Sequence, residues 1–313
     1  MTKKRVLSLL KVIVSAALLV FVFTRVGWAD IASALARVRL YWLGLALAVY
    51  VLGVFVRAVR WRLLLPRLDA PAINIRRLVE LYFVSFFFNS FLPTGIGGDV
   101  VRIAEVSQAV GVPAAASSVI ADRAIGLAAT SLLALSALPF VGSRLSLPLA
   151  LITGATATSI PVAFWLLTRY RSQEFSAASY LPSFVRPLAR QVGETAKALA
   201  AYTQPQLAQA LAVSLAFALT NVLTYAFIGA ALEVDLSLAY YMLVSPVITL
   251  VLLIPVSVNG LGTRDLTYQA LFVPVGVAPQ DALAMSLAYH ALNLLAAFIG
   301  GVVYTLIGVA EAA

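Results

Sequence analysis

Cysteine is absent from this chain of 313 residues, and histidine occurs only once, as His290. Without cysteine the chain can form neither a disulfide nor a thiolate metal site. The sequence also lacks Gly-x-Ser-x-Gly, His-Glu-x-x-His and Walker-type motifs, and it has no cluster of aspartate and histidine suited to a metal. We therefore expect no metal, no cofactor and no enzymatic activity.

Charged residues are also scarce, at 11%, whereas 62% of the residues are hydrophobic and the mean hydropathy is +0.98. A chain this apolar cannot bury its surface in one soluble core. Six apolar runs are each long enough, with their flanks, to cross about 30 Å of hydrocarbon. We expect an all-α polytopic membrane protein with about six full transmembrane helices, at residues 12–23, 43–56, 124–141, 145–167, 207–232 and 283–309.

Two further apolar runs, 79–92 and 240–254, are shorter, and each ends in a glycine-rich loop. Their length predicts re-entrant or interrupted segments, with full spans as the alternative if the loops continue them. Interrupted segments at matching positions of two halves indicate a transporter-like binding site. The first loop reads Asn89-Ser-Phe-Leu-Pro93-Thr-Gly95-Ile-Gly97-Gly98-Asp99-Val-Val-Arg102. The second, about 165 residues later, reads Leu253-Ile-Pro255-Val-Ser-Val-Asn259-Gly260-Leu-Gly262-Thr-Arg264-Asp265.

Both loops are followed by similar short sequences, which predicts two repeats within a single transmembrane domain. These sequences are Gly111-Val-Pro113 and Gly276-Val-Ala-Pro279. We place the first repeat at 41–141, with its loop at 89–105, and the second at 207–309, with its loop at 253–268. Residues 169–206 are predicted to be a cytoplasmic interfacial connector with an amphipathic helix that ends before Pro205.

The distribution of arginine predicts the orientation in the membrane. Arginines cluster at positions 57, 60, 62, 67, 76 and 77 and again from 169 to 190, whereas Glu233 and Asp235 mark an outer loop. This pattern places the N-terminus in the cytoplasm. The two interrupted segments would then enter from opposite faces of the membrane, which describes an inverted repeat.

The first loop combines backbone freedom with charge. Gly95, Gly97 and Gly98 would let the backbone approach a ligand and leave main-chain N–H groups free to face it. Asp99 and Arg102 are three residues apart, so they can pair on one side of a helix that starts there. Asp99 also suits the N-terminal turn of that helix, because a carboxylate is favourable near the positive end of the helix dipole.

A planar guanidinium grips phosphate with two hydrogen bonds, so we expect Arg102 and Arg264 to hold an anionic headgroup. In the structural alternative, Arg102 pairs with Asp99 or Glu105, and Arg264 pairs with Asp265. Both interpretations stay open at this point. Ionisable residues at membrane depth are rare, which favours a functional site as the working hypothesis.

The full set of candidate binding residues surrounds these charges. It comprises Asn89, Pro93, Gly95, Gly97, Gly98, Asp99, Arg102, Glu105, Arg123, Asn259, Gly260, Gly262, Arg264 and Asp265. Arg123 lies at the edge of an apolar run, so a role as a topology anchor is an equal alternative. His290 lies inside the last run, where it is a candidate proton relay or, more commonly for a lone histidine, a hydrogen-bonding residue between helices.

Together the two motifs resemble the transmembrane flippase-like domain of lysylphosphatidylglycerol synthases, the multiple peptide resistance factors. The resemblance covers nearly the whole chain, with Asp265 where many relatives have glutamate. It implies movement of aminoacylated phosphatidylglycerol between leaflets, and for stand-alone relatives a link to glycolipid or polyprenyl-phosphate pathways. Synthase activity is not expected, because these residues include no soluble aminoacyltransferase domain.

We therefore expect a stand-alone member in the cytoplasmic (inner) membrane of a bacterium or archaeon. It would move a phospholipid, aminoacyl-phospholipid or polyprenyl-phosphate-linked headgroup between leaflets, with Asp99 and Asp265 orienting Arg102 and Arg264. The net charge of +9 favours anionic lipid headgroups over nucleic acid as partners, unless these charges only set the topology.

Two other functions remain open. A non-transporting scaffold would recruit a lipid-modifying enzyme or a glycosyltransferase through basic cytoplasmic residues such as Arg186 and Arg190. An intramembrane enzyme acting on lipid phosphate is disfavoured, because the sequence offers no pair of nucleophile and base.

Overall fold

The computed structural model describes residue 33 and residues 37–66, 73–91, 97–141, 146–169, 186–253, 257 and 260–312. Within these residues the regular structure is helical and no strand occurs, so the expected all-α polytopic membrane fold is confirmed. The elements are α3 (Leu40–Leu64), α4 (Ile75–Phe91), α5 (Gly97–Val110), α6 (Val112–Val141), α7 (Leu147–Arg169), α8 (Arg186–Ala200), α9 (Gln204–Ala231), α10 (Leu238–Leu253), α11 (Thr263–Phe272), the 3-10 helix η4 (Val273–Val275) and α12 (Pro279–Ala312).

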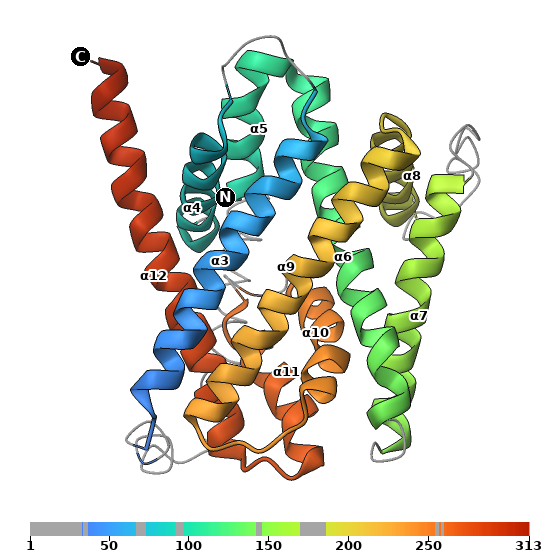
Figure 1. Cartoon of the computed structure of the whole chain (residues 1–313), viewed down its shortest axis with the longest axis vertical. Coiled ribbons are helices and arrows are strands. Elements are labelled where there is room, and N and C mark those ends of the chain that lie inside the picture. Colours follow the sequence, from blue (N-terminus) through green and yellow to red (C-terminus); the bar gives the residue numbers. More distant parts are fainter. Residues whose placement is uncertain are drawn as a thin grey trace, which may run out of the picture.

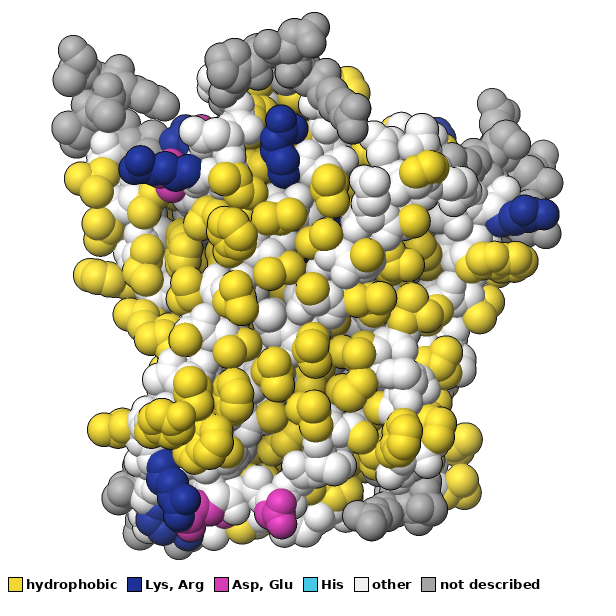
Figure 2. All heavy atoms as spheres, viewed as in Figure 1, with side chains coloured by type: hydrophobic (Ala, Val, Ile, Leu, Met, Phe, Trp, Pro, Cys, Tyr) yellow, Lys and Arg dark blue, Asp and Glu magenta, His cyan; other side chains and the backbone are white. Residues whose placement is uncertain are grey.

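Among the described residues, five helices are long and apolar enough to span a membrane, namely α3, α6, α7, α9 and α12. They coincide with five of the six predicted spans. The sixth, at residues 12–23, lies outside the described residues. Figure 2 shows hydrophobic side chains over the middle of the visible face and charged side chains near the two ends, as expected where the middle of the bundle faces lipid.

Each of the two shorter apolar runs forms one short helix, and a second short helix follows after the loop (Figure 1). The α4 and α5 pair lies in the upper half of the view, and the α10 and α11 pair lies in the lower half. Each pair is preceded and followed by a long helix, in the order α3 to α6 and again α9 to α12. The predicted residues Pro93 and Gly95, between α4 and α5, lie outside the described residues, as does Asn259 between α10 and α11.

Local side-chain chemistry explains where several helices begin. The Asn74 side chain accepts a hydrogen bond from the backbone N–H of Arg77 at 2.8 Å and so caps the start of α4. Thr203 and Gln206 form a reciprocal capping box at the start of α9. Gly111, with φ of +81°, supplies the left-handed turn that separates α5 from α6.

Packing between the helices builds one bundle. The α3 and α9 helices lie side by side, while α4 packs on α12 and α10 packs on α6 (Figure 1). The largest hydrophobic core includes Leu243 and Phe272, and a second core includes Trp61 and Tyr82. The connector between α7 and α9 contains α8, which packs against α6 and α7 and buries Leu199.

Candidate functional site

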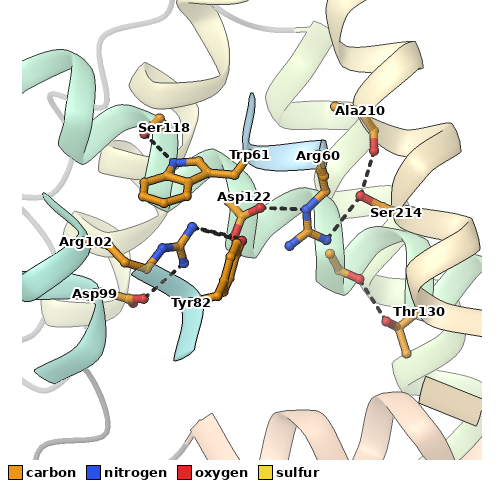
Figure 3. Close-up of polar contacts among 11 residues, drawn as sticks. Arg60, Trp61, Tyr82, Asp99, Arg102, Ser118, Asp122, Thr130, Ala210 and Ser214 are labelled. Carbon is orange, nitrogen blue, oxygen red and sulfur yellow. Dashed lines mark hydrogen bonds and ion pairs between the residues drawn. The ribbon is translucent and has the colours of Figure 1, made fainter. Parts of the chain in front are cut away.

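One carboxylate, that of Asp122 in α6, lies at the centre of a buried polar network (Figure 3). Arg60 of α3 donates from Nε to Asp122 Oδ1 at 2.6 Å, and Arg102 of α5 donates from Nη2 to Oδ2 at 3.2 Å. The Tyr82 hydroxyl of α4 donates to Oδ2 at 2.8 Å, and Arg60 Nη1 donates to Ser214 Oγ of α9 at 3.2 Å. All five residues of this Asp122 network are at most 2% exposed. The network therefore joins five helices inside the bundle.

The guanidinium of Arg102 is enclosed by aromatic rings. Its Cζ lies 4.0 Å from the ring centre of Trp61 and 4.1 Å from that of Tyr82. The Trp61 ring is itself fixed, because its indole N–H donates to Ser118 Oγ at 3.0 Å (Figure 3). Such desolvated cation–π contacts are worth up to about 2 kcal/mol. Arg102 is thus held by the protein on its faces as well as through its N–H groups.

Asp99 lies in the first turn of α5, as predicted, and pairs with two arginines. Its carboxylate is 3.6 Å from Arg102 Nη1 and 2.5 Å from Arg123 Nη2. The predicted pairing of Asp99 with Arg102 is therefore present, and Arg123 joins the same group. The alternative pairing of Arg102 with Glu105 is wrong, because Glu105 accepts a hydrogen bond from Arg77 at 2.9 Å instead.

Arg57 and Arg60, two of the arginines from which the sequence predicted the orientation, lie inside the bundle. The α3 helix continues through Leu64 and places both on its inner face. Arg57 lies over aromatic rings, with Cζ 4.8 Å from the ring centre of Tyr82 and 5.2 Å from that of Phe217. Among the described residues, it has no carboxylate within ion-pair distance.

Arg264 occupies the first turn of α11 and is 7% exposed. Its Nη1 lies 2.9 Å from His290 Nδ1 of α12, and its Cζ lies 5.6 Å from the ring centre of Tyr289. Arginine only donates hydrogen bonds, so His290 accepts through an unprotonated Nδ1 in this contact. The structure thus places His290 beside the arginine that the sequence singled out.

Asp265 does not pair with Arg264, contrary to the structural alternative and to the expectation that it orients this arginine. Its Oδ1 accepts from Ser286 Oγ at 2.6 Å, and its Oδ2 accepts from the backbone N–H of Gly262 at 3.0 Å. Asp265 is three residues past the helix cap, which lets the carboxylate turn back to cap α11. Within the described part of the chain, no group of three His, Asp or Glu side chains is placed to hold a metal ion.

Charge is unbalanced in this interior. The other three interior arginines share Asp122 and Asp99, whereas Arg57 and Arg264 have no carboxylate partner among the described residues. The Nε atoms of both are buried without a hydrogen-bond partner in the same part of the chain. A buried charge without a counter-charge costs several kcal/mol, so the buried Arg264 in particular favours the binding of an anion.

A polar and aromatic region lies near these two arginines. The rings of Tyr50 and Tyr289 are 6.1 Å apart, and their hydroxyls donate to Asn293 at 3.0 Å and to Asn221 at 3.1 Å. Both arginines lie close enough to act electrostatically on the hydroxyl of Tyr50. The central polar region, as we name it, consists of Tyr50, Arg57, Asn221, Arg264, Tyr289, His290 and Asn293. All but Arg264 are only half-buried, so a molecule the size of water reaches each of them.

The predicted glycines serve the fold. A Cβ at Gly98 would overlap Ser85, and the backbone N–H of Gly98 donates to Asn89 Oδ1 at 2.8 Å. The expectation of a free amide is therefore wrong at Gly98, and the N–H of Gly262 is likewise bound, by the carboxylate of Asp265 that caps α11. Gly260 and Gly262 have φ of +74° and +77°, which other residues rarely adopt. Gly97, the first residue of α5, is buried.

A comparison with known protein families identifies the family of this chain. The model of the lysylphosphatidylglycerol synthase TM region matches residues 8–301. The chain belongs to this family. Neither a curated protein nor a solved structure matches the chain. The match includes both pairs of short helices, four of the five described spanning helices and α12 as far as residue 301. The chain is therefore a multi-pass membrane protein tied to lipid handling.

In this member of the lysylphosphatidylglycerol synthase TM family, several residues at the centre of the site lie outside the two loop motifs that the sequence singled out. Asp122 adjoins the predicted run 124–141, and it becomes an ionisable residue at membrane depth, a functional candidate by default, only because α6 begins at Val112. Arg57 and Arg60 are three residues apart, so they share a helix face once α3 is extended to include them. Tyr50 and Tyr289 carried no signal, since tyrosine is common in apolar segments.

Proposed function

We propose that this member of the family moves a lipid with an anionic phosphate headgroup between the leaflets, and that Arg57 and Arg264 hold the phosphate in transit. The observation that carries the proposal is the pair of interior arginines without carboxylate partners among the described residues. Both lie close enough to act electrostatically on the hydroxyls of Tyr50 and Tyr289 in the central polar region. A phosphate there would supply the missing negative charge.

The physical barrier to lipid movement is desolvation of the headgroup. A phosphate that leaves water without hydrogen bonds or counter-charge is strongly disfavoured in hydrocarbon. Each guanidinium offers five N–H donors in a planar fork that matches phosphate oxygens. Donors already fixed within the protein need no rearrangement when the headgroup arrives, so they lower this barrier more effectively than mobile groups.

Arg102 has a supporting role in this proposal, although its sequence motif first suggested a phosphate ligand. It is 1% exposed, lies between two rings and donates to Asp122. A ligand would have to displace those contacts. Arg264 has one side-chain hydrogen-bonding partner, His290, and keeps further donors for a ligand.

We also infer an inverted repeat that relates the two halves of the bundle. Its support is the exchange of packing partners: α4 of the first half packs on α12 of the second, and α10 of the second packs on α6 of the first. The short helix pairs occupy opposite halves of the bundle in Figure 1. In transporters built this way, the site lies near the repeat interface, where rocking of one half against the other exposes it alternately.

We infer the orientation from the positive-inside rule. Arg62, Arg76 and Arg169 lie near the end of the bundle where α3 and α7 finish and α4 begins. At the other end, Glu233 and Asp281 pair with exposed arginines. This difference favours a cytoplasmic location for the first end, in a bacterial or archaeal inner membrane with the N-terminus inside.

Lipid translocation in proteoliposomes tests the proposed function. Fluorescent phosphatidylglycerol on the outer leaflet is quenched with dithionite, and the rate at which inner label becomes accessible is measured. Loss of one charge-assisted hydrogen bond costs about 1.5–3 kcal/mol, so Arg57→Gln and Arg264→Gln should each slow translocation by about 10-fold to 100-fold. Arg190→Gln, on the exposed face of α8, is the matched control and should keep the parent rate.

The same assay distinguishes the proposal from a scaffold. If the parent protein moves no phospholipid and no polyprenyl phosphate, transport is refuted. A scaffold that recruits a lipid-modifying enzyme or a glycosyltransferase would then be favoured. Such a scaffold should lose its partner in Arg186→Gln or Arg190→Gln and keep it in Arg264→Gln. Mass spectrometry of the lipids before and after the assay would reveal an enzymatic product, which our proposal does not expect.

A further inference from the structure

An apolar groove lies between α4 and α12, which pack along each other on one side of the bundle (Figure 1). Its volume is about 420 Å³. The side chains that matter for its chemistry are Phe87 and Ser90 of α4 and Leu294, Phe298, Val302 and Thr305 of α12. None of these residues belongs to the central polar region or to the Asp122 network.

The groove offers only hydrocarbon to an occupant. Its two hydroxyls are engaged within their own helices, since Ser90 donates to the carbonyl of Phe86 at 3.0 Å and Thr305 donates to that of Val302 at 2.8 Å. Phe298 is 70% exposed, and Leu294 and Val302 are nearly half exposed. In a protein that spans the membrane, such a groove opens toward lipid, and an apolar chain matches its lining.

The groove adjoins the central polar region along α12. On α12, Leu294 follows His290 by four residues, which places the two on the same face one turn apart. On α4, Ser90 follows Asn89, whose side chain holds the backbone N–H of Gly98 at the start of α5. A molecule with a charged head at Arg264 and an apolar tail would therefore meet the groove within one helical turn.

We propose that the groove holds an acyl chain of the transported lipid while its phosphate is bound at Arg264. The inference rests on the proposed function and narrows its substrate class to phosphate lipids with a long flexible hydrocarbon chain. An apolar cavity of about 150 Å³ holds one benzene ring, so 420 Å³ has room for a long part of one chain. Lipid tails are as apolar as the groove, so the groove adds little affinity for the acyl chain. Its main effect is to guide the chain.

The corresponding part of the other half is covered by another helix. The corresponding seam lies between α6 and α10, and α7 packs against both of these helices. Leu149 and Ala157 of α7 are buried in the core there. The helix α7 therefore covers that part of the other half, whereas the groove between α4 and α12 is open to an acyl chain.

Photo-crosslinking tests this placement. The protein is reconstituted in vesicles of phosphatidylethanolamine and phosphatidylglycerol, with a trace of phosphatidylglycerol that carries a diazirine within one acyl chain. After illumination, labelled peptides are mapped by mass spectrometry. We expect residues 294–305 to be labelled several-fold more than the exposed face of α7 around Val162 and Trp165. In Arg264→Gln, labelling of 294–305 should fall to the level of α7.

Two outcomes overturn the inference. Equal labelling of α12 and α7 would mean that ordinary surrounding lipid reaches both, or that the chain's own residues 1–32 cover the groove. Unchanged labelling of the groove in Arg264→Gln would mean that the chain is not linked to a headgroup at this arginine.

A second pair of variants separates the groove from the proposed function. Val302→Trp fills the groove and should slow translocation of long-chain phosphatidylglycerol several-fold, whereas Val162→Trp, at a similarly exposed position on α7, should not. Equal rates in the two variants would refute the groove while transport stands. Groove labelling in a protein that translocates no lipid would refute transport while the chain site stands.

Discussion

Asp122→Asn is the perturbation that tests the interior of the bundle most severely. The substitution keeps the shape of the side chain and removes its negative charge. Asp122 receives hydrogen bonds from Arg60, Arg102 and Tyr82, all of them buried. After the substitution, Arg60 has no carboxylate within ion-pair distance among the described residues, and Arg102 keeps only Asp99 at 3.6 Å.

The expected cost follows from this loss of counter-charge. Removing one partner of a buried ion pair typically costs about 3–5 kcal/mol, because the other charge stays buried. A neutral hydrogen bond between membrane helices averages only about 0.6 kcal/mol. The charge, more than the number of hydrogen bonds, therefore decides the outcome. At roughly 1.5 °C per kcal/mol for a chain of 313 residues, unfolding should occur about 5–8 °C lower.

Intrinsic tryptophan fluorescence during heating in detergent measures the shift, and Trp61 lies against the affected arginine. Arg190→Gln removes an exposed pair with Glu194 and should cost below about 0.5 kcal/mol. Adding Arg60→Met to Asp122→Asn should restore part of the lost stability, since one uncompensated charge is gone. An unfolding temperature for Asp122→Asn close to that of the Arg190 control would refute our description of the network.

Two further predictions concern single positions. Gly98→Ala should lower the unfolding temperature, because the new Cβ would overlap Ser85. The control Gly154→Ala on α7 meets nothing within 4 Å and should be neutral or stabilising by up to about 1 kcal/mol. Equal melting curves for the two variants would contradict the close contact at Gly98. His290→Gln keeps an acceptor for Arg264 and should retain most of the translocation rate, whereas His290→Leu should slow it about tenfold. A complete loss in the glutamine variant would instead indicate that His290 relays protons.

Local features of the bundle could be predicted from the sequence. The apolar runs located the five described spanning helices, because length and hydropathy are properties of a single segment. The start of α5 and the contact between Asp99 and Arg102 followed from helix geometry over one turn. The amphipathic pattern indicated a helix where α8 occurs, and Pro205 lies in the first turn of the next helix.

Contacts between distant helices could not be predicted in the same way. Arg60 and Asp122 are 62 residues apart, and their pairing depends on how α3 packs against α6. The positive-inside pattern did not reveal that Arg57 and Arg60 face the interior, because it counts charge near the end of a span without identifying which face is buried. Asp265 adjoins Arg264 in sequence, yet the start of α11 turns its carboxylate back to the helix cap.

The central claim is that Arg57 and Arg264 hold one headgroup phosphate, and a double-mutant cycle on phosphatidylglycerol translocation tests it most directly. Rates are measured at matched reconstitution for the parent, Arg57→Gln, Arg264→Gln and the double variant. We predict that each single substitution slows translocation at least about tenfold and that the double variant is little slower than the slower single, because the two side chains share one ligand. Parent-like rates in both single variants would contradict the claim.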